Sequence, residues 1–308
     1  MSVTLNGGVT FGGGLTLTAA PTAKNAIFGY GDTNGGGALS ITNLVSNTGV
    51  VANDTSGVGT ARYNLAASGY GTDKAIFGYG YASPSYRSMT NLVSNTGVVA
   101  TDTSGVGTAR YSLAAADYGT DKAIFGYGST GTNTAVTNLV SNTGVVANDT
   151  SGVGTARYSL AAAGYGTDKA IFGYGYNAGS GVSITNLVSN TGVVSTDTAG
   201  VGTARSSLAA AGYGTDKAIF GYGYAGGGVS ITNLVSNTGV VATNTTGVGS
   251  ARSNLAATSY GIGTAIFGYG ITSVTVSITN LVSNTGVVAT DTTGVGTARN
   301  DPAAAAYG

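Results

Sequence analysis

The sequence predicts an all-β protein, a six-bladed β-propeller with four strands in each blade that is closed by its C-terminal strand. Three observations predict this fold. Three motifs recur six times each with a spacing near 47 residues. Turn-forming residues divide every repeat into short β-like runs. No apolar pattern of helical period is present, and 54 glycines in 308 residues disfavour helices.

The repeat is defined by its motifs. The string NLVSNTGVV starts at residues 43, 91, 138, 186, 233 and 280, and AIFGYG starts at residues 26, 75, 123, 170, 218 and 265. The string TAR, once SAR, ends each time in an arginine, at Arg62, Arg110, Arg157, Arg205, Arg252 and Arg299. A repeat of this length accommodates four short strands and four tight turns.

The strands follow in order within each repeat. In the copy at 158–190 we expect the first over YSLAAAGY (158–165), the second over KAIFGYG (169–175) and the third over VSITNLVSN (182–190). A GVVANDT-type segment supplies the fourth. The residues YGTD and Asn-Thr-Gly break the runs, and Gly and Asn tolerate the positive φ that tight hairpins require.

Closure of the ring is predicted from the order of the segments. The first and last copies resemble the middle ones, and a ring needs no capping repeats. The second strand of the first repeat starts at Ala26, while the chain finishes with a first-strand segment at 301–308. We expect 301–308 to complete the first blade, and 15–25 is the alternative. The propeller then spans 23–308. Residues 1–22 form a β-arm that either anchors the ring to a neighbour or adds an outer strand to it.

The order of these motifs resembles the kelch repeat. In that family an arginine-led strand precedes a strand that ends in a double glycine, and Gly173-Tyr174-Gly175 stands in that place here. The chain has no Trp, so the family's later Tyr and Trp positions are not met. The segments NLVSNTGVVATDTTGVGTAR and DKAIFGYG also resemble tandem arrays in predicted tail or fibre proteins of marine bacteriophages. That resemblance implies a virion location, with other virion structural proteins as partners.

Variation between the copies is concentrated in one connection. Every length change falls between the second and third strands, where 10 to 12 positions separate the last Gly of AIFGYG from the Asn of NLVSN. Six different loops on a rigid frame are a common way to build a recognition surface. The alternative is that these loops contact nothing and tolerate change. The candidate ligand-binding residues are Asp32, Asn34, Tyr81, Tyr86, Arg87, Asn133, Tyr176, Asn177 and Tyr224.

The repeated charged residues have mainly structural interpretations. Each TAR arginine precedes a first strand, where its five donors suit backbone carbonyls across a blade boundary, or where six guanidinium groups could hold an anion at a channel mouth. The repeated aspartates are expected to bond their own backbone two residues on and so to form turns. Catalysis by paired aspartates and calcium binding are the alternatives.

Absent residue types restrict the chemistry. The chain contains no His, Cys, Glu or Trp, which excludes Ser-His-Asp and Cys-His catalysis and zinc sites of His or Cys. We therefore expect no enzyme, no cofactor and no metal. Twelve basic residues balance twelve acidic ones along the chain, so nucleic-acid binding is not expected. No apolar stretch approaches the roughly 20 residues of a membrane span.

These expectations combine into one function and one alternative. The function is that of a non-enzymatic virion protein of the tail or fibre, which displays variable loops and docks through its arm. The alternative is a free-standing, lectin-like propeller that binds carbohydrate on a host surface and is located extracellularly. An enzyme would need an aspartate-based site that the sequence does not reveal.

Overall fold

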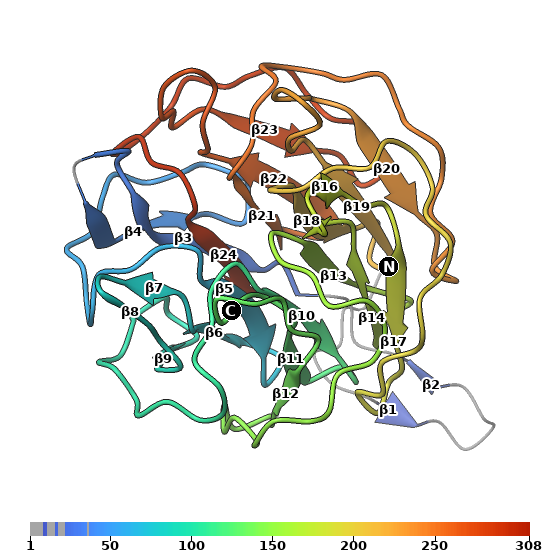
Figure 1. Ribbon diagram of the computed structural model, residues 1–308, viewed down its shortest axis with the longest axis horizontal. Coiled ribbons are helices and arrows are strands. Elements are labelled where there is room, and N and C mark those ends of the chain that lie inside the picture. The colour runs from blue at the N-terminus through green and yellow to red at the C-terminus, as the bar shows by residue number, and fades with distance from the viewer. Residues whose placement is uncertain (1–8, 11–15, 18–21, 36) are drawn as a thin grey trace.

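The computed structural model describes residues 9–10, 16–17, 22–35 and 37–308. The regular elements of this part are all β-strands, as Figure 1 shows, so the prediction of an all-β protein is confirmed. Among the described residues, none belongs to a helix long and apolar enough to cross a membrane.

Six antiparallel sheets of three strands each make up most of the described chain. They are numbered here from 1 to 6 along the chain. Sheet 1 contains β24 (Ala303–Tyr307), β3 (Asn25–Asp32) and β4 (Ala38–Val45), and sheet 2 contains β5 (Ala66–Tyr70), β6 (Lys74–Gly78) and β9 (Thr90–Val93). Sheet 3 contains β10 (Ala114–Tyr118), β11 (Lys122–Gly126) and β12 (Thr137–Val140), and sheet 4 contains β13 (Ala161–Tyr165), β14 (Lys169–Gly173) and β17 (Thr185–Val188). Sheet 5 contains β18 (Ala209–Tyr213), β19 (Lys217–Gly221) and β20 (Thr232–Val235), and sheet 6 contains β21 (Ala256–Tyr260), β22 (Thr264–Gly268) and β23 (Thr279–Val282).

The inner strands are the first strand of each sheet, namely β24, β5, β10, β13, β18 and β21. Each inner strand contacts the next, and β21 contacts β24, so the contacts run through all six sheets and return to the start. In Figure 1 the six sheets accordingly surround a common centre. Alanine is frequent in the inner strands, and its small side chain lets six strands converge.

The two ends of the chain meet in sheet 1. The strand β24 pairs antiparallel with β3, from Ala303 opposite Gly29 to Tyr307 opposite Asn25. The expectation that 301–308 completes the first sheet is therefore confirmed. The competing segment is placed differently, because β2 (Thr16–Leu17) pairs with β1 (Val9–Thr10). The rest of the predicted arm, at 1–8, 11–15 and 18–21, lies outside the described residues, and its anchoring role stays a prediction.

The predicted fourth strand does not form as a regular strand. In sheet 1 the segment after β4 makes two isolated bridges, Val51 with Val45 and Thr55 with Thr42, and the other five sheets repeat this pattern. Residues 52–56 are exposed, so burial supplies little energy to hold a continuous ladder. The side chain of Asp54 instead bonds to a distant segment, as described below.

The second strand is also shorter than predicted. The strand β14 ends at Gly173 because Tyr174 and Gly175 adopt left-handed φ values of 61° and 109°. Such φ values interrupt extended β-structure. In sheets 2 to 6 the Gly-Tyr-Gly motif is a sharp bend that follows the strand and leads into the variable loop. In sheet 1 the same bend is a register shift between Gly29 and Gly31, beyond which β3 continues to Asp32.

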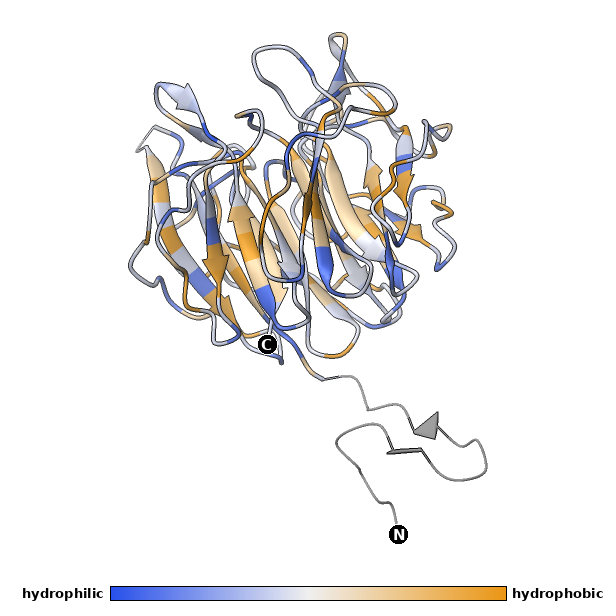
Figure 2. Cartoon of the chain, turned by 90° about the horizontal axis from the view of Figure 1, so that it is seen from below, coloured by the Kyte–Doolittle hydropathy of each residue, from blue (hydrophilic) through white to orange (hydrophobic). Residues whose placement is uncertain are grey.

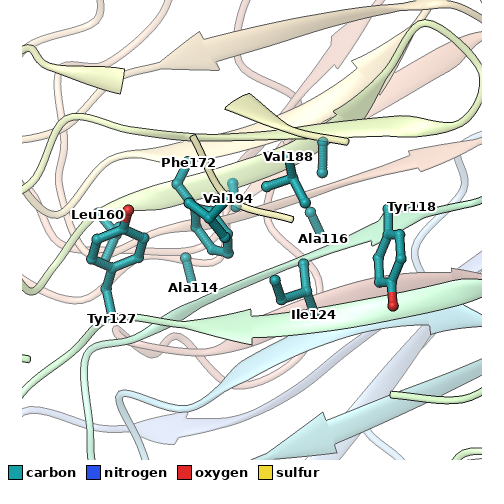
Figure 3. Packing of buried hydrophobic residues seen from close by; sticks show 11 residues of the cluster. Ala114, Ala116, Tyr118, Ile124, Tyr127, Leu160, Phe172, Val188 and Val194 are labelled. Atoms are coloured by element: carbon teal, nitrogen blue, oxygen red, sulfur yellow. The ribbon is translucent and has the colours of Figure 1, made fainter. Parts of the chain in front are cut away.

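The hydrophobic core lies between neighbouring sheets. Between sheets 3 and 4, Ile124 and Ala116 pack against Phe172 and Val188 (Figure 3). Gly126 makes room for the aromatic ring, because a Cβ at this position would lie 2.7 Å from Phe172 Cζ. The same contact repeats between the other sheets. Seen from the side, apolar residues line the strands and hydrophilic ones lie toward their ends (Figure 2).

Candidate binding surface at the loop face

Each sheet presents its connections at two opposite ends. The loop face carries the variable connections between second and third strands, and the turn face carries the tight turns between first and second strands. The candidate ligand-binding residues all belong to the loop face. The repeated arginines and aspartates lie next to it, and their geometry shows how the face is held.

The TAR arginines are buried between sheets. Arg62 is 0% exposed, and its Nε donates to Tyr79 O at 2.9 Å, its Nη1 to Thr60 O at 3.1 Å and its Nη2 to Asn91 Oδ1 at 2.7 Å. Its guanidinium carbon lies 4.3 Å above the ring of Tyr30 in sheet 1. The side chain thus bonds to sheet 2, whereas the backbone of Arg62 bonds to sheet 1, through Arg62 N to Leu39 O at 3.2 Å and Gly31 N to Arg62 O at 3.0 Å. The stacking contact also reaches sheet 1.

The side-chain bond to Tyr79 O agrees with the expected carbonyl bond across the boundary, because the Arg62 backbone is held by sheet 1. A cation–π contact, which was not expected, crosses the boundary in all six copies, at 4.0 to 4.4 Å. All six arginines are 0% exposed, so they offer no guanidinium group to an anion in the channel. The remaining pairs are Arg110 on Tyr79, Arg157 on Tyr127, Arg205 on Tyr174, Arg252 on Tyr222 and Arg299 on Tyr269.

The tyrosine under each arginine adopts a strained backbone conformation. Tyr30 has φ of 63°, which bulky residues rarely adopt, yet it is 0% exposed. Its ring lies between Arg62 and the edge of Phe77, whose centroid is 5.1 Å away, and its hydroxyl donates to Val58 O at 3.1 Å. Burial raises the pKa of Tyr30. These contacts on both faces hold the strained bend at the base of each loop.

The aspartates of the fourth segments also join distant parts of the chain. Asp102 accepts hydrogen bonds from Thr60 N at 3.0 Å, from Thr60 Oγ1 at 2.6 Å and from Asn91 Nδ2 at 2.9 Å. Burial alone would raise the pKa of Asp102, but the hydrogen bonds from Thr60 and Asn91 lower it. The expectation of a local turn bond is wrong here, since Thr60 precedes Asp102 by 42 residues.

The second set of repeated aspartates lies in the tight turns between first and second strands. Asp73 Oδ1 lies 2.7 Å from Lys74 Nζ, and the same adjacent ion pair recurs in sheets 3, 4 and 5. The turn itself is stabilised by backbone bonds between sheets. Gly71 N donates to Asp121 O at 2.7 Å, and equivalent bonds link each turn to the next around all six sheets.

A second cycle of backbone hydrogen bonds lies at the loop face. The residue two positions after each TAR arginine donates its N–H to the equivalent carbonyl of the previous sheet, at 2.8 to 3.2 Å. The six members, each with φ between 50° and 55°, are Asn64, Ser112, Ser159, Ser207, Asn254 and Asp301. They line a cavity on the central axis, which we call the mouth. The mouth is therefore a rigid backbone ring with six side chains.

A cluster of partly exposed tyrosines surrounds one side of the mouth. Tyr81 and Tyr86 are on the hairpin of β7 (Tyr81–Ala82) and β8 (Ser85–Tyr86). Tyr86 stacks on Tyr111 with a centroid distance of 4.9 Å, and Tyr81 contacts Tyr63 at 5.4 Å. The sequence analysis missed Tyr63 and Tyr111, although both directly follow a TAR arginine, which was the available signal. We call Tyr63, Tyr81, Tyr86 and Tyr111 the tyrosine cluster.

The other candidate residues are more scattered. Tyr176 and Asn177 form β15 (Tyr176–Asn177), which pairs with β16 (Ser180–Gly181), and the Tyr176 ring contacts Tyr158 at 5.5 Å. Asn133 Nδ2 donates to Asn177 Oδ1 at 3.3 Å, so these two candidates meet across sheets 3 and 4. Tyr224 is 50% exposed and has no aromatic neighbour among the described residues.

The polar candidates at sheets 1 and 2 are held locally. Asn34 N donates to Asp32 Oδ2 at 3.1 Å, the two-residue turn bond that was expected of aspartate in general. Arg87 Nη2 donates to Ala82 O at 3.2 Å within the hairpin. No group of three or more acidic, His or Cys residues that could hold a metal ion occurs in the part of the chain that the structure describes.

Comparison with known proteins adds no assignment, because no protein-family model and no curated protein matches the chain. The geometry alone therefore carries the argument: a rigid polar mouth with a tyrosine cluster on one side, framed by loops of different sequence.

Proposed function

We propose that the chain is a six-bladed β-propeller that acts as a non-enzymatic structural and binding protein. Each sheet with its two-bridge fourth segment constitutes one blade. Support comes from the contacts that run through all six inner strands and from two cycles of backbone hydrogen bonds, one at each face. A ring of this kind holds its loops in fixed positions, which favours recognition.

The loop face binds carbohydrate in this proposal, and the tyrosine cluster is the observation that carries it. Its four rings are partly exposed and lie within 4.9 to 6.4 Å of a neighbour. The C–H face of a pyranose packs well on such a ring, and its hydroxyls require the donors and acceptors that the mouth supplies. Tyrosine also loses little conformational entropy on binding.

A glycan array tests carbohydrate binding directly. We expect the wild-type protein to retain at least one oligosaccharide and Tyr86→Ala to weaken that binding roughly tenfold, by the loss of one apolar contact face. Tyr224→Ala is the matched control, because it removes an exposed tyrosine outside the cluster. Replacing the 80–89 loop with the shorter GYAGGGVS segment should abolish binding. The proposal fails if no oligosaccharide is retained, or if Tyr86→Ala binds like the wild type.

A virion setting, in the tail or a fibre, is the second part of the proposal, and it rests on the resemblance to bacteriophage arrays. The difference between the two faces supports it. The turn face repeats one Asn-Thr-Gly-Val turn six times and exposes a valine each time, at 65% to 66%. These valines are Val50, Val98, Val145, Val193, Val240 and Val287. Six equivalent exposed valines suit docking to other virion structural proteins, together with the 1–22 arm.

Cryo-electron microscopy of intact particles from the source of the chain tests this setting. We expect a six-bladed disc at a fixed position, with the turn face against a neighbouring protein and the loop face outward. Particles that lack the disc would contradict the virion setting and leave a free-standing extracellular binding protein.

A further inference from the structure

One of the six positions of the mouth differs in charge from the others. Five positions carry the neutral side chains of Asn or Ser, and the sixth is Asp301. Asp301 shares φ near 50° with its counterparts and takes part in the same backbone cycle, through Asp301 N to Asn254 O at 2.8 Å. The pseudo-sixfold mouth is therefore electrostatically one-sided, with its charge at sheet 1.

A second carboxylate lies beside Asp301. Asp32 and Asn300 form a backbone bridge with reciprocal N–H···O bonds of 2.9 Å, and Asn300 Nδ2 donates to Asp301 Oδ2 at 3.0 Å. Asn300 is 9% exposed, and its Oδ1 is buried without a hydrogen-bond partner. Burial raises the pKa of Asp301 to about 7. The hydrogen bond with Asn254 lowers this pKa, and the charge of Asp32 raises it.

The carboxyl groups adjoin the tyrosine cluster. Gly31 N, next to Asp32, donates to Arg62 O at 3.0 Å, and Asn64 N donates to Asp301 O at 3.2 Å, so Tyr63 lies between backbone bonds to both acidic segments. Burial raises the pKa of Tyr63, and the charges of Tyr81, Asp32 and Asp301 raise it further. Tyr63 and Tyr81 meet edge to face, whereas Tyr86 and Tyr111 stack at an interplanar angle of 15° and cover one face of each other. Sheets 1 and 2 thus place the tyrosine cluster next to the carboxyl groups of Asp32 and Asp301.

We propose that the saccharide binds at this junction, between Tyr63 and the pair Asp32 and Asp301. The site accepts neutral or amine-bearing sugars and rejects acidic ones. The inference depends on the proposed carbohydrate-binding function. Hydroxyl groups donate well to carboxylate oxygens, and an amine gains a charge-assisted bond. A sugar carboxylate would instead meet like charge in a partly desolvated site.

Among the described residues, no cationic side chain forms an ion pair with Asp32 or Asp301. The six TAR arginines are 0% exposed. Lys74, Lys122, Lys169 and Lys217 belong to the turn face, where each pairs with an adjacent aspartate. Arg87, the remaining arginine, donates to Ala82 O in its own hairpin. No cationic side chain is among the groups that shift the pKa of Asp301.

The test uses array glycans in matched pairs that differ only in a carboxylate, such as sialylated and desialylated oligosaccharides, or uronic acid and hexose oligomers. At pH 8 we expect the wild-type protein to bind the neutral member of each pair at least about tenfold more tightly than the acidic member. The D32N/D301N double variant should bring this ratio close to one. It should fold, because Asn already occupies positions 64 and 254, which are equivalent to 301, and because position 32 keeps its backbone bonds to Asn300. Ser159→Asn, at the mouth but away from sheet 1, is the control and should leave the ratio unchanged.

The pH provides a second readout. Below pH 7 Asp301 gains a proton, so selectivity against acidic sugars should weaken between pH 8 and pH 6. A preference for the acidic member, or a ratio that D32N/D301N leaves intact, would overturn the inference while leaving carbohydrate binding in place. Failure to retain any oligosaccharide would reject both.

Discussion

The Asn244→Asp substitution offers a sharp test of the bonds between the fourth segments and the TAR motifs. In five of the six sheets an aspartate accepts hydrogen bonds from the Thr or Ser of a TAR motif. In sheet 5, Asn244 takes the place of the aspartate. Thr203 N still donates to Asn244 Oδ1 at 3.1 Å, and the Asn244 amide donates to Thr203 Oγ1 at 2.7 Å. The geometry is preserved, but the charge is missing.

The missing charge coincides with a defect nearby. In sheet 5 alone, Arg205 Nη2 and Asn233 Oδ1 are buried without partners, whereas Arg62 and its equivalents donate to the corresponding asparagine. Hydrogen bonds to charged groups contribute about 1 kcal/mol more than neutral ones. Because the N244D carboxylate would accept from the threonine and attract Arg205, we expect a gain of about 1 to 2 kcal/mol in the free energy of unfolding.

Thermal and guanidinium denaturation measure this gain. The N244D protein should unfold about 2 to 4 °C higher than the wild type at pH 7. In the equivalent sites hydrogen bonds lower the pKa of the aspartate, as for Asp197. The gain is therefore present above the unfolded pKa near 4 and is lost as the pH falls through the lower folded value. Asp197→Asn is the matched control and should lose a similar amount. An N244D protein no more stable than the wild type would refute the reasoning.

Three further substitutions test other parts of the structure. Arg62→Met should destabilise the protein by about 3 to 5 kcal/mol in guanidinium denaturation. The substitution leaves buried acceptors without a donor and removes the cation–π contact with Tyr30. An unchanged denaturation midpoint would contradict the role of the inter-sheet arginine. Gly126→Ala should cost about 1 to 3 kcal/mol by the same assay, since its Cβ would lie 2.7 Å from the Phe172 ring, and a neutral result would mean that the ring shifts freely. Thr72→Gly should stabilise by about 0.5 to 1 kcal/mol, because Thr72 has φ of 71°; a loss of thermal stability would show that the threonine is not strained.

Much of the secondary structure could be predicted because each repeat carries its own local signals. The Ala-Ile-Phe run lies in a fully buried second strand in each sheet, and the residues YGTD turn as expected. The fourth strand was predicted in error, because the alternation of VANDT suggested a strand while the exposure of these residues was unknown. Local pattern also suggested turn bonds for Asp102, yet its partner Thr60 belongs to the previous repeat segment.

The candidate site was predicted only in part for a related reason. Variation between the copies indicated the loop that carries Tyr81 and Tyr86. Tyr63 and Tyr111 belong to a repeated segment, so the comparison of copies gave no reason to select them. The mouth was not predicted at all, since Asn64 and Asp301 are separated by almost the whole chain and share nothing but their position after an arginine.

The sequence by itself determined the all-β class, the sixfold repeat, the buried second strands and the pairing of the C-terminal strand with the first repeat. These follow from periodicity and turn chemistry, which act over a few residues. Only the tertiary structure decided that the TAR arginines stack on tyrosines of the preceding sheet, that the aspartates bind distant threonines and that backbone bonds bring the segments of Asp32 and Asp301 to that of Tyr63. Those contacts join residues from different repeats, and near-identical repeats cannot indicate which copies become neighbours until the sheets are packed side by side.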